Sequence, residues 1–83
     1  MSLIDRPIRV EADRRNRPVA FVWRGIRRVV AEVLEEWREI GPWWEQDPPE
    51  ERFVYRVQTQ DGGVYEIDYR IPARQWFLYR IYD

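Results

Sequence analysis

The basic side chains are the first candidates for chemistry in this sequence, because all fourteen of them are arginines. A guanidinium group binds carboxylates and phosphates through paired hydrogen bonds. Several of these arginines lie in the first third of the chain, where they can follow the phosphates of a nucleic acid while surface aromatic rings stack on its bases. The candidate nucleic-acid contacts are Arg14, Arg15, Arg17, Arg27 and Arg28.

Two adjacent tryptophans, Trp43 and Trp44, are the candidate residues for contact with a protein. They lie in residues 41–51, an acidic connector in which Pro48 and Pro49 exclude regular strand pairing. Adjacent residues of an extended segment point to opposite sides. The pair therefore either folds back and caps the open ends of a small sheet, which the burial statistics of tryptophan favour, or forms a binding surface.

Groups suited to catalysis are scarce. The sequence contains no histidine, cysteine or lysine, and Ser2 and Thr59 are its only hydroxyl residues besides tyrosine, so no nucleophile has a base beside it. The acids in residues 32–39 have the spacing of a solvated face, and those in residues 45–51 match no calcium loop. We predict that the protein is not an enzyme and uses no cofactor or metal.

Composition indicates one small folded domain over residues 1–83. Hydrophobic residues make up 45% and charged residues 35%, which argues against global disorder. The net charge is −1 but uneven: residues 1–28 hold eight arginines against three acids, and residues 29–51 hold one against eight. No apolar run reaches membrane-spanning length and no signal peptide is evident. We therefore expect a cytoplasmic protein.

Residues 52–83 carry the clearest strand pattern. Apolar residues alternate with polar ones in three successive runs, and the apolar members are odd-numbered. This parity predicts a three-residue loop, Asp61-Gly62-Gly63, with Gly63 at positive φ and Val57 opposite Ile67. A five-residue connection would then set Tyr69 opposite Tyr79. The even face would hold an acid between two arginines: Arg56, Asp68 and Arg80.

The first half of the chain predicts two more strands. Residues 8–12 alternate and fit an edge strand, and residues 19–23 are apolar on both faces, as in a buried strand. The dipeptide Arg24-Gly25 indicates a tight turn after the second of them.

Residues 26–40 are compatible with either a helix or a strand. Their apolar residues fall at helical spacing, and Gly41-Pro42 would end a helix. However, no capping residue precedes them, and Arg27 and Arg28 would face the positive end of the helix dipole. A strand is possible if a bulge near Leu34 changes the direction of Trp37.

The chain resembles a small bacterial domain that also closes the C-terminal end of Y-family DNA polymerase-like proteins of the ImuB type. The matching residues begin with Pro18-x-x-Phe21-x-Trp23-x-Gly25, Val33-Leu34-x-x-Trp37 and Trp43-Trp44, and they continue with Arg52-Phe53, Asp61-Gly62-Gly63-Val64-Tyr65 and Trp76-Phe77-Leu78-x-x-x-Tyr82-Asp83. In those relatives a Gly-Pro dipeptide stands where this chain has Glu35-Glu36, and proline would break a helix there. The resemblance therefore implies a strand.

These observations predict an all-β fold, a small antiparallel meander or partial barrel of five to six strands. The alternative is an α+β fold with residues 26–40 as a helix on the sheet. We expect a non-catalytic protein-interaction module with a protein partner and no membrane contact. The resemblance implies an accessory role in error-prone lesion bypass or DNA repair. The alternative function is a nucleic-acid-binding β domain that uses the N-terminal arginines.

Overall fold

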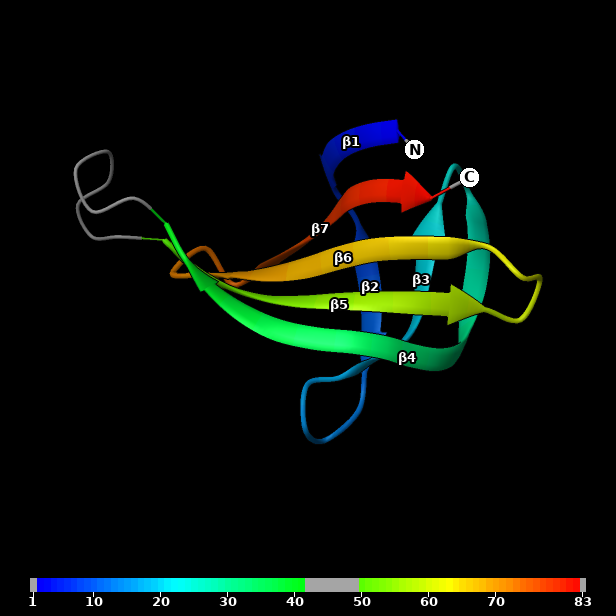
Figure 1. Cartoon of the computed structure of the whole chain (residues 1–83), viewed down its shortest axis with the longest axis horizontal. Coiled ribbons are helices and arrows are strands. Elements are labelled where there is room, and N and C mark those ends of the chain that lie inside the picture. The colour runs from blue at the N-terminus through cyan, green and yellow to red at the C-terminus, as the bar shows by residue number, and fades with distance from the viewer. Residues whose placement is uncertain (1, 42–49, 83) are drawn as a thin grey trace.

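The residues that the structure describes form an antiparallel β structure of seven strands. The computed structural model describes residues 2–41 and 50–82, and no helix occurs among them. The strands are β1 (Ser2–Pro7), β2 (Arg9–Ala12), β3 (Pro18–Trp23), β4 (Ile26–Ile40), β5 (Glu51–Thr59), β6 (Val64–Ile71) and β7 (Gln75–Tyr82). Their order across the sheet is β1-β7-β6-β5-β4-β3-β2 (Figure 1). The all-β prediction is confirmed, and the α+β alternative is wrong.

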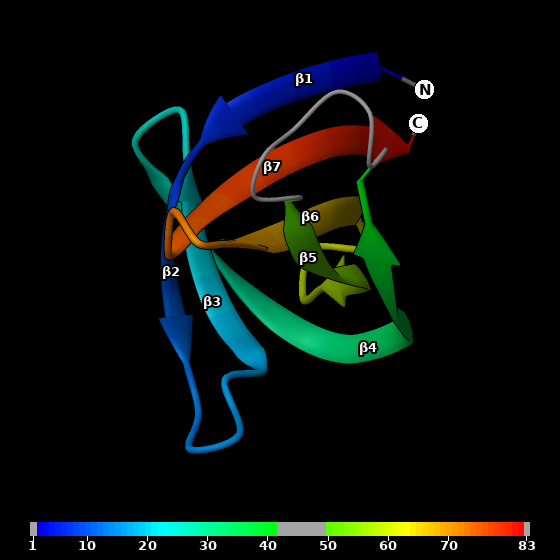
Figure 2. The same cartoon turned by 90° about the vertical axis from the view of Figure 1, so that its left-hand side faces the viewer.

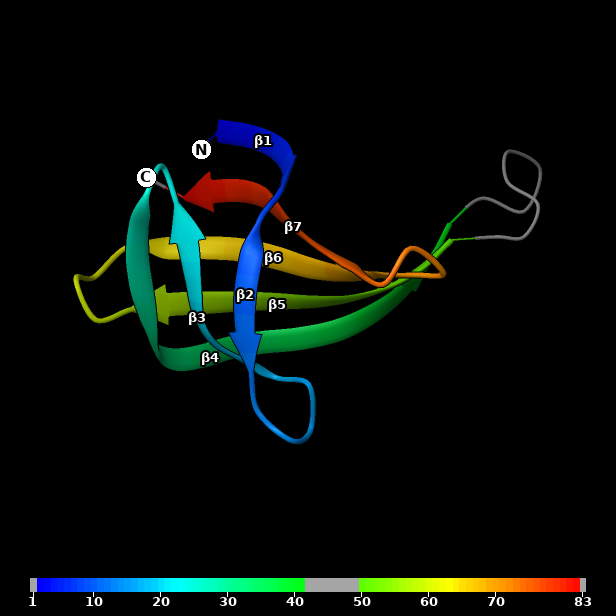
Figure 3. The same ribbon diagram turned by 180° about the vertical axis from the view of Figure 1, so that it is seen from behind.

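The sheet curls into a half-barrel (Figure 2). Its two outermost strands, β1 and β2, are consecutive in the chain and are separated only by Ile8. β1 pairs with β7, β2 pairs with β3, and the Ile8 N–H donates a hydrogen bond to the Trp76 carbonyl at 3.0 Å. Seen from behind, β2 and β3 cross in front of β5 and β6 (Figure 3). The N-terminal segment thus holds both ends of the curled sheet.

Strand β1 is the element that the five to six predicted strands omit. Its apolar residues Leu3 and Ile4 are adjacent, so the segment has no period of two. The register against β7 shifts between Leu3 and Arg6, and Asp5 has φ of 51°. An irregular edge strand of this kind pairs through its backbone without the alternation that would reveal it.

Strand β4 contains two bulges, which explain its helix-like pattern. Its register against β5 shifts between Val30 and Glu32 and again between Val33 and Glu35. Each shift adds one residue to a period of two, so the apolar positions come to resemble helical spacing. The second bulge lies at Leu34, as the strand alternative predicted, and it places Trp37 opposite Val54 on the outer face.

In the β5–β6 hairpin, odd-numbered residues lie opposite odd-numbered residues, as predicted, but the loop consists of a different set of residues. Thr59 pairs with Gly63, with the Thr59 N–H donating to the Gly63 carbonyl at 2.9 Å, and Val57 lies opposite Tyr65 rather than Ile67. The positive φ of 91° belongs to Gly62 and not to Gly63. A Cβ at residue 63 would lie 2.8 Å from the Tyr65 ring, so a glycine is needed there for close packing.

Asp61 stabilises this hairpin and gives a pH-dependent prediction. Its carboxylate accepts hydrogen bonds from the Thr59 hydroxyl, the Gly63 N–H (3.2 Å) and Arg28 (2.9 Å). The Thr59 and Gly63 bonds, with the nearby Arg28 charge, lower the pKa of Asp61. A lowered pKa contributes stability above the unfolded-state pKa, and this contribution disappears as the pH falls through the folded-state pKa.

We expect Asp61→Asn to lower the denaturation midpoint at pH 7 and to leave it nearly unchanged at the most acidic pH where the protein still folds. Urea titrations at both pH values measure this, and an equal loss at both would contradict it.

The pairing of β7 differs from the parity prediction. Tyr69 lies opposite Trp76 rather than Tyr79, so an odd-numbered residue pairs with an even-numbered one. The register then shifts between Glu66 and Ile67, and beyond this shift the odd-numbered Tyr65 lies opposite the odd-numbered Ile81. The core therefore receives Trp76 and Leu78, whereas Phe77 points to the outer face. The connection is a short turn in which the Arg74 N–H donates to the Arg70 carbonyl at 2.7 Å.

The core lies inside the half-barrel. Its buried apolar members come from the N-terminal segment, β3, β5, β6 and β7: Ile8, Phe21, Tyr55, Val57, Tyr65, Ile67, Trp76 and Leu78. Phe21 and Tyr65 meet edge to face with ring centroids 5.1 Å apart. No helix that could cross a membrane is found in the part of the chain that the structure describes.

The outer face carries buried acids between arginines. The acid that lies across from both Arg56 and Arg80 is Glu66, not Asp68 as predicted, because the β5–β6 register differs. Glu66 is 4.0 Å from Arg56 and 3.7 Å from Arg80. Asp68 instead meets Arg70 at 2.8 Å and Arg52 at 3.6 Å, and it is 1% exposed. These ion pairs, with aromatic rings beside the guanidinium groups, cover the outside of the sheet.

Candidate interaction site

Strand β4 is much longer than its neighbour β3, and this difference creates an open edge. The register of β3 against β4 runs only from Trp23 opposite Ile26 to Ala20 opposite Val29. Beyond Val29, β4 pairs with β5 on its other edge as far as Ile40. Among residues 2–41 and 50–82, no strand pairs with the β3 side of β4 along this stretch. We call this stretch, residues 30–40, the open edge of β4.

Alternate backbone groups of the open edge point away from β5. The Gly41 N–H donates to the Glu50 carbonyl at 2.7 Å, so residue 41 faces β5. Hydrogen-bonded and non-hydrogen-bonded pairs alternate along an antiparallel ladder. Glu36, Arg38 and Ile40 therefore direct their N–H and C=O groups toward the open side. Within the described residues, no backbone bond to another segment is present for Glu36 or Arg38 on that side.

Two cavities follow the open edge. A cavity of about 430 Å³ is lined by the successive residues 36–38, and a second of about 270 Å³ is lined by residues 30–33. Successive side chains of a strand point to opposite faces, so a cavity that touches three or four residues in a row lies along the strand's edge. The loop between β2 and β3 lines the far side of the larger cavity, and the same loop together with Pro18 and Val19 of β3 lines the far side of the smaller one. We call this space the β4 groove.

The β2–β3 loop is held in place by Asp13. The Asp13 carboxylate accepts the backbone N–H groups of Arg15 (2.9 Å) and Arg17 (3.0 Å), and these bonds lower its pKa. The Tyr55 hydroxyl donates to the Asn16 carbonyl at 3.4 Å. Arg17 spans the groove and approaches Glu36 at 3.3 Å, with 41% and 51% of the two side chains exposed. The loop is therefore ordered, but the ion pair across the groove is open to water.

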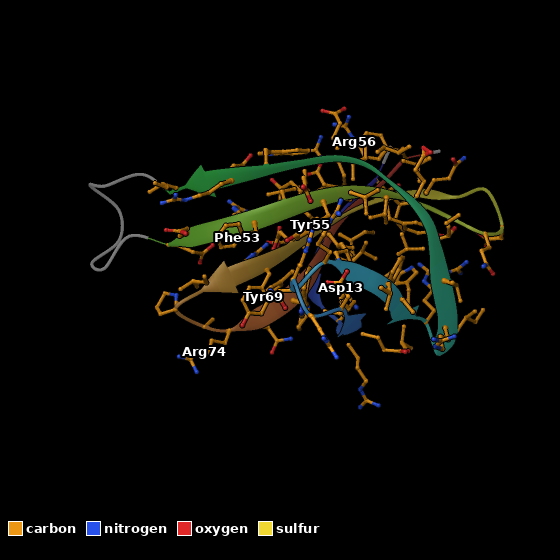
Figure 4. The ribbon with its side chains drawn as sticks, turned by 90° about the horizontal axis from the view of Figure 1, so that it is seen from below. Asp13, Phe53, Tyr55, Arg56, Tyr69 and Arg74 are labelled. Atoms are coloured by element: carbon orange, nitrogen blue, oxygen red, sulfur yellow. The ribbon has the colours of Figure 1, made fainter. Side chains whose placement is uncertain are left out.

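Aromatic side chains form the inner wall of the groove and continue into the core. Phe53 and Tyr55 line the larger cavity. Tyr55 also contacts Trp76, with ring centroids 5.7 Å apart, and Tyr69 contacts Trp76 at 5.1 Å. Figure 4 shows Phe53, Tyr55 and Tyr69 on the side of the sheet that faces the Asp13 loop, whereas Arg56 points the other way. Burial raises the pKa of Tyr55, so its hydroxyl stays protonated as a donor.

The five candidate nucleic-acid arginines do not form one surface. Arg14, Arg15 and Arg17 lie on the β2–β3 loop beside the groove. Arg27 makes a two-bond ion pair with Glu11, at 2.6 and 2.9 Å, near the β3–β4 turn. Arg28 binds Asp61 at 2.9 Å and lies 5.6 Å from the Tyr65 ring centroid. Only the first three are thus brought together.

The candidate interaction residues Trp43 and Trp44 lie outside the described residues. The groove residues Glu36, Arg38, Phe53 and Tyr55 were not selected from the sequence. A signal was nevertheless present, because the Arg24-Gly25 turn joins a short apolar run to a much longer one. A hairpin with unequal arms leaves part of the longer arm without a partner on that side.

Acidic side chains in the described residues do not assemble into a metal site. No group of three or more potential ligands comes together in residues 2–41 and 50–82. The groove carboxylates Glu36 and Asp13 are instead engaged with an arginine side chain and with backbone N–H groups, respectively. The arrangement is suited to binding a chain of matching shape and charge along the edge of a strand.

The fold and this edge define a small β domain with an open groove beside one strand. The chain belongs to the DUF6504 family, a domain family of unknown function, whose model matches residues 3–83. No curated protein and no solved structure matches it. Nothing in the family match connects the chain with ImuB-type proteins, so that link stays a prediction.

Proposed function

We propose that the protein is a non-catalytic protein-interaction module and that the β4 groove is its contact surface. The observation that carries this proposal is the open edge of β4, which lies beside a cavity walled by Phe53 and Tyr55. Unpaired backbone groups supply affinity for an extended chain, and a neighbouring pocket supplies selectivity for its side chains. The sequence resemblance supports an accessory role in lesion bypass or DNA repair for this module.

A second candidate function is the binding of single-stranded nucleic acid. It is supported by Arg14 and Arg15, whose side chains have no ion pair within the described residues, and by the rings of Phe53 and Tyr55, which line the same cavity as Arg15. Arg27 and Arg28 do not contribute to this site, because both are occupied by ion pairs elsewhere. The net charge of −1 also weakens attraction to phosphates.

Affinity capture separates the two functions. We expect the wild-type protein, immobilised and exposed to a bacterial lysate, to retain a protein partner after nuclease treatment and in moderate salt. Reversal of two groove charges, Arg15→Glu with Arg38→Glu, should remove this partner. The control Arg6→Glu with Arg9→Glu makes the same change in net charge on β1 and β2 and should retain it. Capture that is equal in both variants would contradict the assignment of the groove.

Binding to a fluorescent oligothymidine tests the second function directly. A nucleic-acid module would bind it through Arg14, Arg15 and Arg17, with affinity falling by roughly 0.7 log units per log unit of salt for each phosphate neutralised. We expect no such binding at physiological salt. Strong, salt-sensitive binding that Arg14→Ala with Arg15→Ala and Arg17→Ala abolishes would overturn the interaction module.

The sequence prediction for Trp43 and Trp44 has its own measurement. If these residues form a desolvated contact, Trp43→Ala with Trp44→Ala will weaken capture of the partner by about 2 kcal/mol or more. The thermal midpoint of the variant must stay close to that of the wild type, because a structural role for the two rings would also abolish capture. A folded variant with unchanged capture would contradict the prediction.

A further inference from the structure

We propose that the β4 groove binds an extended acidic peptide segment, which adds to the open edge of β4 as an additional strand. This inference rests on the proposed function and specifies the chemistry of the partner. Its three supports are the direction of the backbone groups along the edge, the position of β3, and the balance of charge across the groove.

The backbone supplies a regular row of hydrogen-bonding groups. Glu36, Arg38 and Ile40 point their N–H and C=O groups to the open side at every second residue, as the Gly41 to Glu50 hydrogen bond requires. This is the pattern that an incoming strand needs. Nine residues in extended form reach about 30 Å, so a short peptide can follow most of the open edge.

The fold leaves space for such a strand in line with β3. β3 begins at Pro18 and occupies the same side of β4 only as far as Val29. The chain before Pro18 turns away into the loop organised by Asp13. The larger cavity lies in the position that a longer β3 would fill, whereas Pro18 and Val19 at the start of β3 line the smaller one. Arg17 lines both cavities. An added strand would therefore extend the β3 row.

Charge determines the composition of the peptide. The larger cavity is lined by Arg15, Arg17 and Arg38 against one acid, Glu36, and Arg38 also pairs with Glu51 at 3.1 Å. The smaller cavity adds two acids, Asp13 and Glu32, so the acidic part of the peptide belongs at the larger cavity. An incoming carboxylate can replace Glu36 as the partner of Arg17, and others can reach Arg15. Aromatic rings at the inner wall favour one apolar side chain among these acids.

On the outer face of the same edge, two of the acids already have arginine partners. Glu35 is bound by Arg56, and Glu39 lies 3.4 Å from Arg52. Peptide residues that point outward therefore meet no free cation here and are expected to be neutral. The partner segment thus alternates acidic and neutral residues, with an aromatic residue near its centre on the acidic side.

A synthetic peptide provides the probe. It has nine residues with blocked ends, valine at the even positions, phenylalanine at the centre and glutamate at the other odd positions. We expect saturating peptide to slow hydrogen exchange at the amides of Glu36 and Arg38 by roughly tenfold or more, as a gained hydrogen bond would. A peptide with lysine in place of glutamate should cause no change. Unchanged exchange with the acidic peptide, or equal protection by both, would overturn the proposal.

Backbone methylation of the peptide tests the strand geometry without altering the protein. Methylation of the amides on one edge of an extended peptide removes the donors that face β4, whereas methylation of the alternate amides leaves them intact. One methylated series should lose binding and the other should retain it. Equal binding of both series would show that no strand is added.

A pair of variants at one residue provides the complementary test. Arg38→Pro removes the N–H that points to the open side, and an edge strand tolerates proline at such a position. Arg38→Ala keeps this N–H, and both substitutions remove the ion pair between Arg38 and Glu51. We expect the proline variant to bind the peptide at least tenfold more weakly than the alanine variant. Equal affinity in two folded proteins would overturn the proposal. If the proline variant does not fold, the methylated peptides still test whether the peptide adds to β4 as a strand.

Failure of this inference is distinguishable from failure of the proposed function. Capture of a protein partner that depends on Arg15 and Arg38, together with unchanged exchange at Glu36, would reject strand addition and retain the interaction module. Protection of the same amides that grows with protein concentration in the absence of peptide would identify a second copy of this chain as the occupant and would overturn the proposal.

Discussion

Truncation of Trp76 to alanine will lower the free energy of unfolding by about 3–5 kcal/mol, whereas Phe77→Ala, one residue further on, will lower it by about 1–2 kcal/mol. Trp76 is 8% exposed and packs against Tyr55 and Tyr69 in the core. Phe77 lies on the outer face with the Arg70 guanidinium 3.8 Å from its ring centroid. The difference follows from the β6–β7 register, which places the even-numbered residue in the core.

Thermal and urea denaturation measure this difference. For a domain of this size, each kcal/mol lowers the melting temperature by roughly 4–8 °C, so the Trp76 variant should be largely unfolded at temperatures where the Phe77 variant is native. A larger loss for Phe77→Ala would mean that the odd-numbered residues of β7 face the core and that the register described above is wrong.

Replacement of Arg70 by alanine will cost about 3–5 kcal/mol at neutral pH, because it leaves a buried carboxylate without its main partner. Arg70 is 2.8 Å from Asp68, which is 1% exposed, and it also contacts Asp5 at 2.5 Å. The same substitution at Arg52, which is 3.6 Å from Asp68 and more exposed, should cost about 1 kcal/mol or less. Urea denaturation of both variants at pH 7 gives the comparison.

The loss in the Arg70 variant should depend on pH. Burial raises the pKa of Asp68 even in the wild type, and removal of Arg70 will raise it further. An acid whose pKa is raised in the folded state binds its proton more tightly there than in the unfolded state. The resulting loss of folding free energy is therefore absent below the unfolded-state pKa, and it grows as the pH rises toward the folded-state pKa. The difference between variant and wild type should therefore shrink on acidification. Asp68→Asn combined with Arg70→Ala should remove the pH dependence, and a constant loss would contradict this account.

The sequence predicted several local features because these depend on neighbouring residues. The Arg24-Gly25 turn and the odd parity of the β5–β6 hairpin each follow from a few adjacent side chains, whereas the bulged strand over residues 26–40, and with it the all-β class, was favoured by the family resemblance and not by the local pattern. Both residues of that turn have positive φ, of 52° and 75°, as a two-residue hairpin requires. Features of this kind are local, and the structure confirms them.

The register of β7 could not be predicted because it depends on two local irregularities that compensate one another. The turn after Ile71 pairs residues of unlike parity, and the register shift beside Glu66 restores like parity near Ile81. Strand β7 has large apolar residues at both its even-numbered and its odd-numbered positions, so either of its two faces could pack against the core. The choice between them was made by packing against Tyr55 and Tyr69, which lie on other strands.

The candidate site was missed for a related reason. An open strand edge is defined by the absence of a neighbour, and no residue type marks an absence. Arginine and tryptophan drew attention because their side chains carry evident chemistry, whereas the groups that point into the β4 groove from Glu36 and Arg38 belong to the backbone.

The junction at Ile8 has a consequence for the order of events during synthesis. The first strand pairs with the last one, with Ser2 opposite Ile81, and Ile8 binds the backbone of Trp76. The barrel wall therefore cannot be completed while β7 is still inside the ribosome. Contacts between segments so far apart in the chain form slowly, and until they form, the edge of β7 that β1 covers stays exposed to other nascent chains. Chaperone demand should accordingly fall at the moment when β7 emerges, rather than gradually as the strands are made.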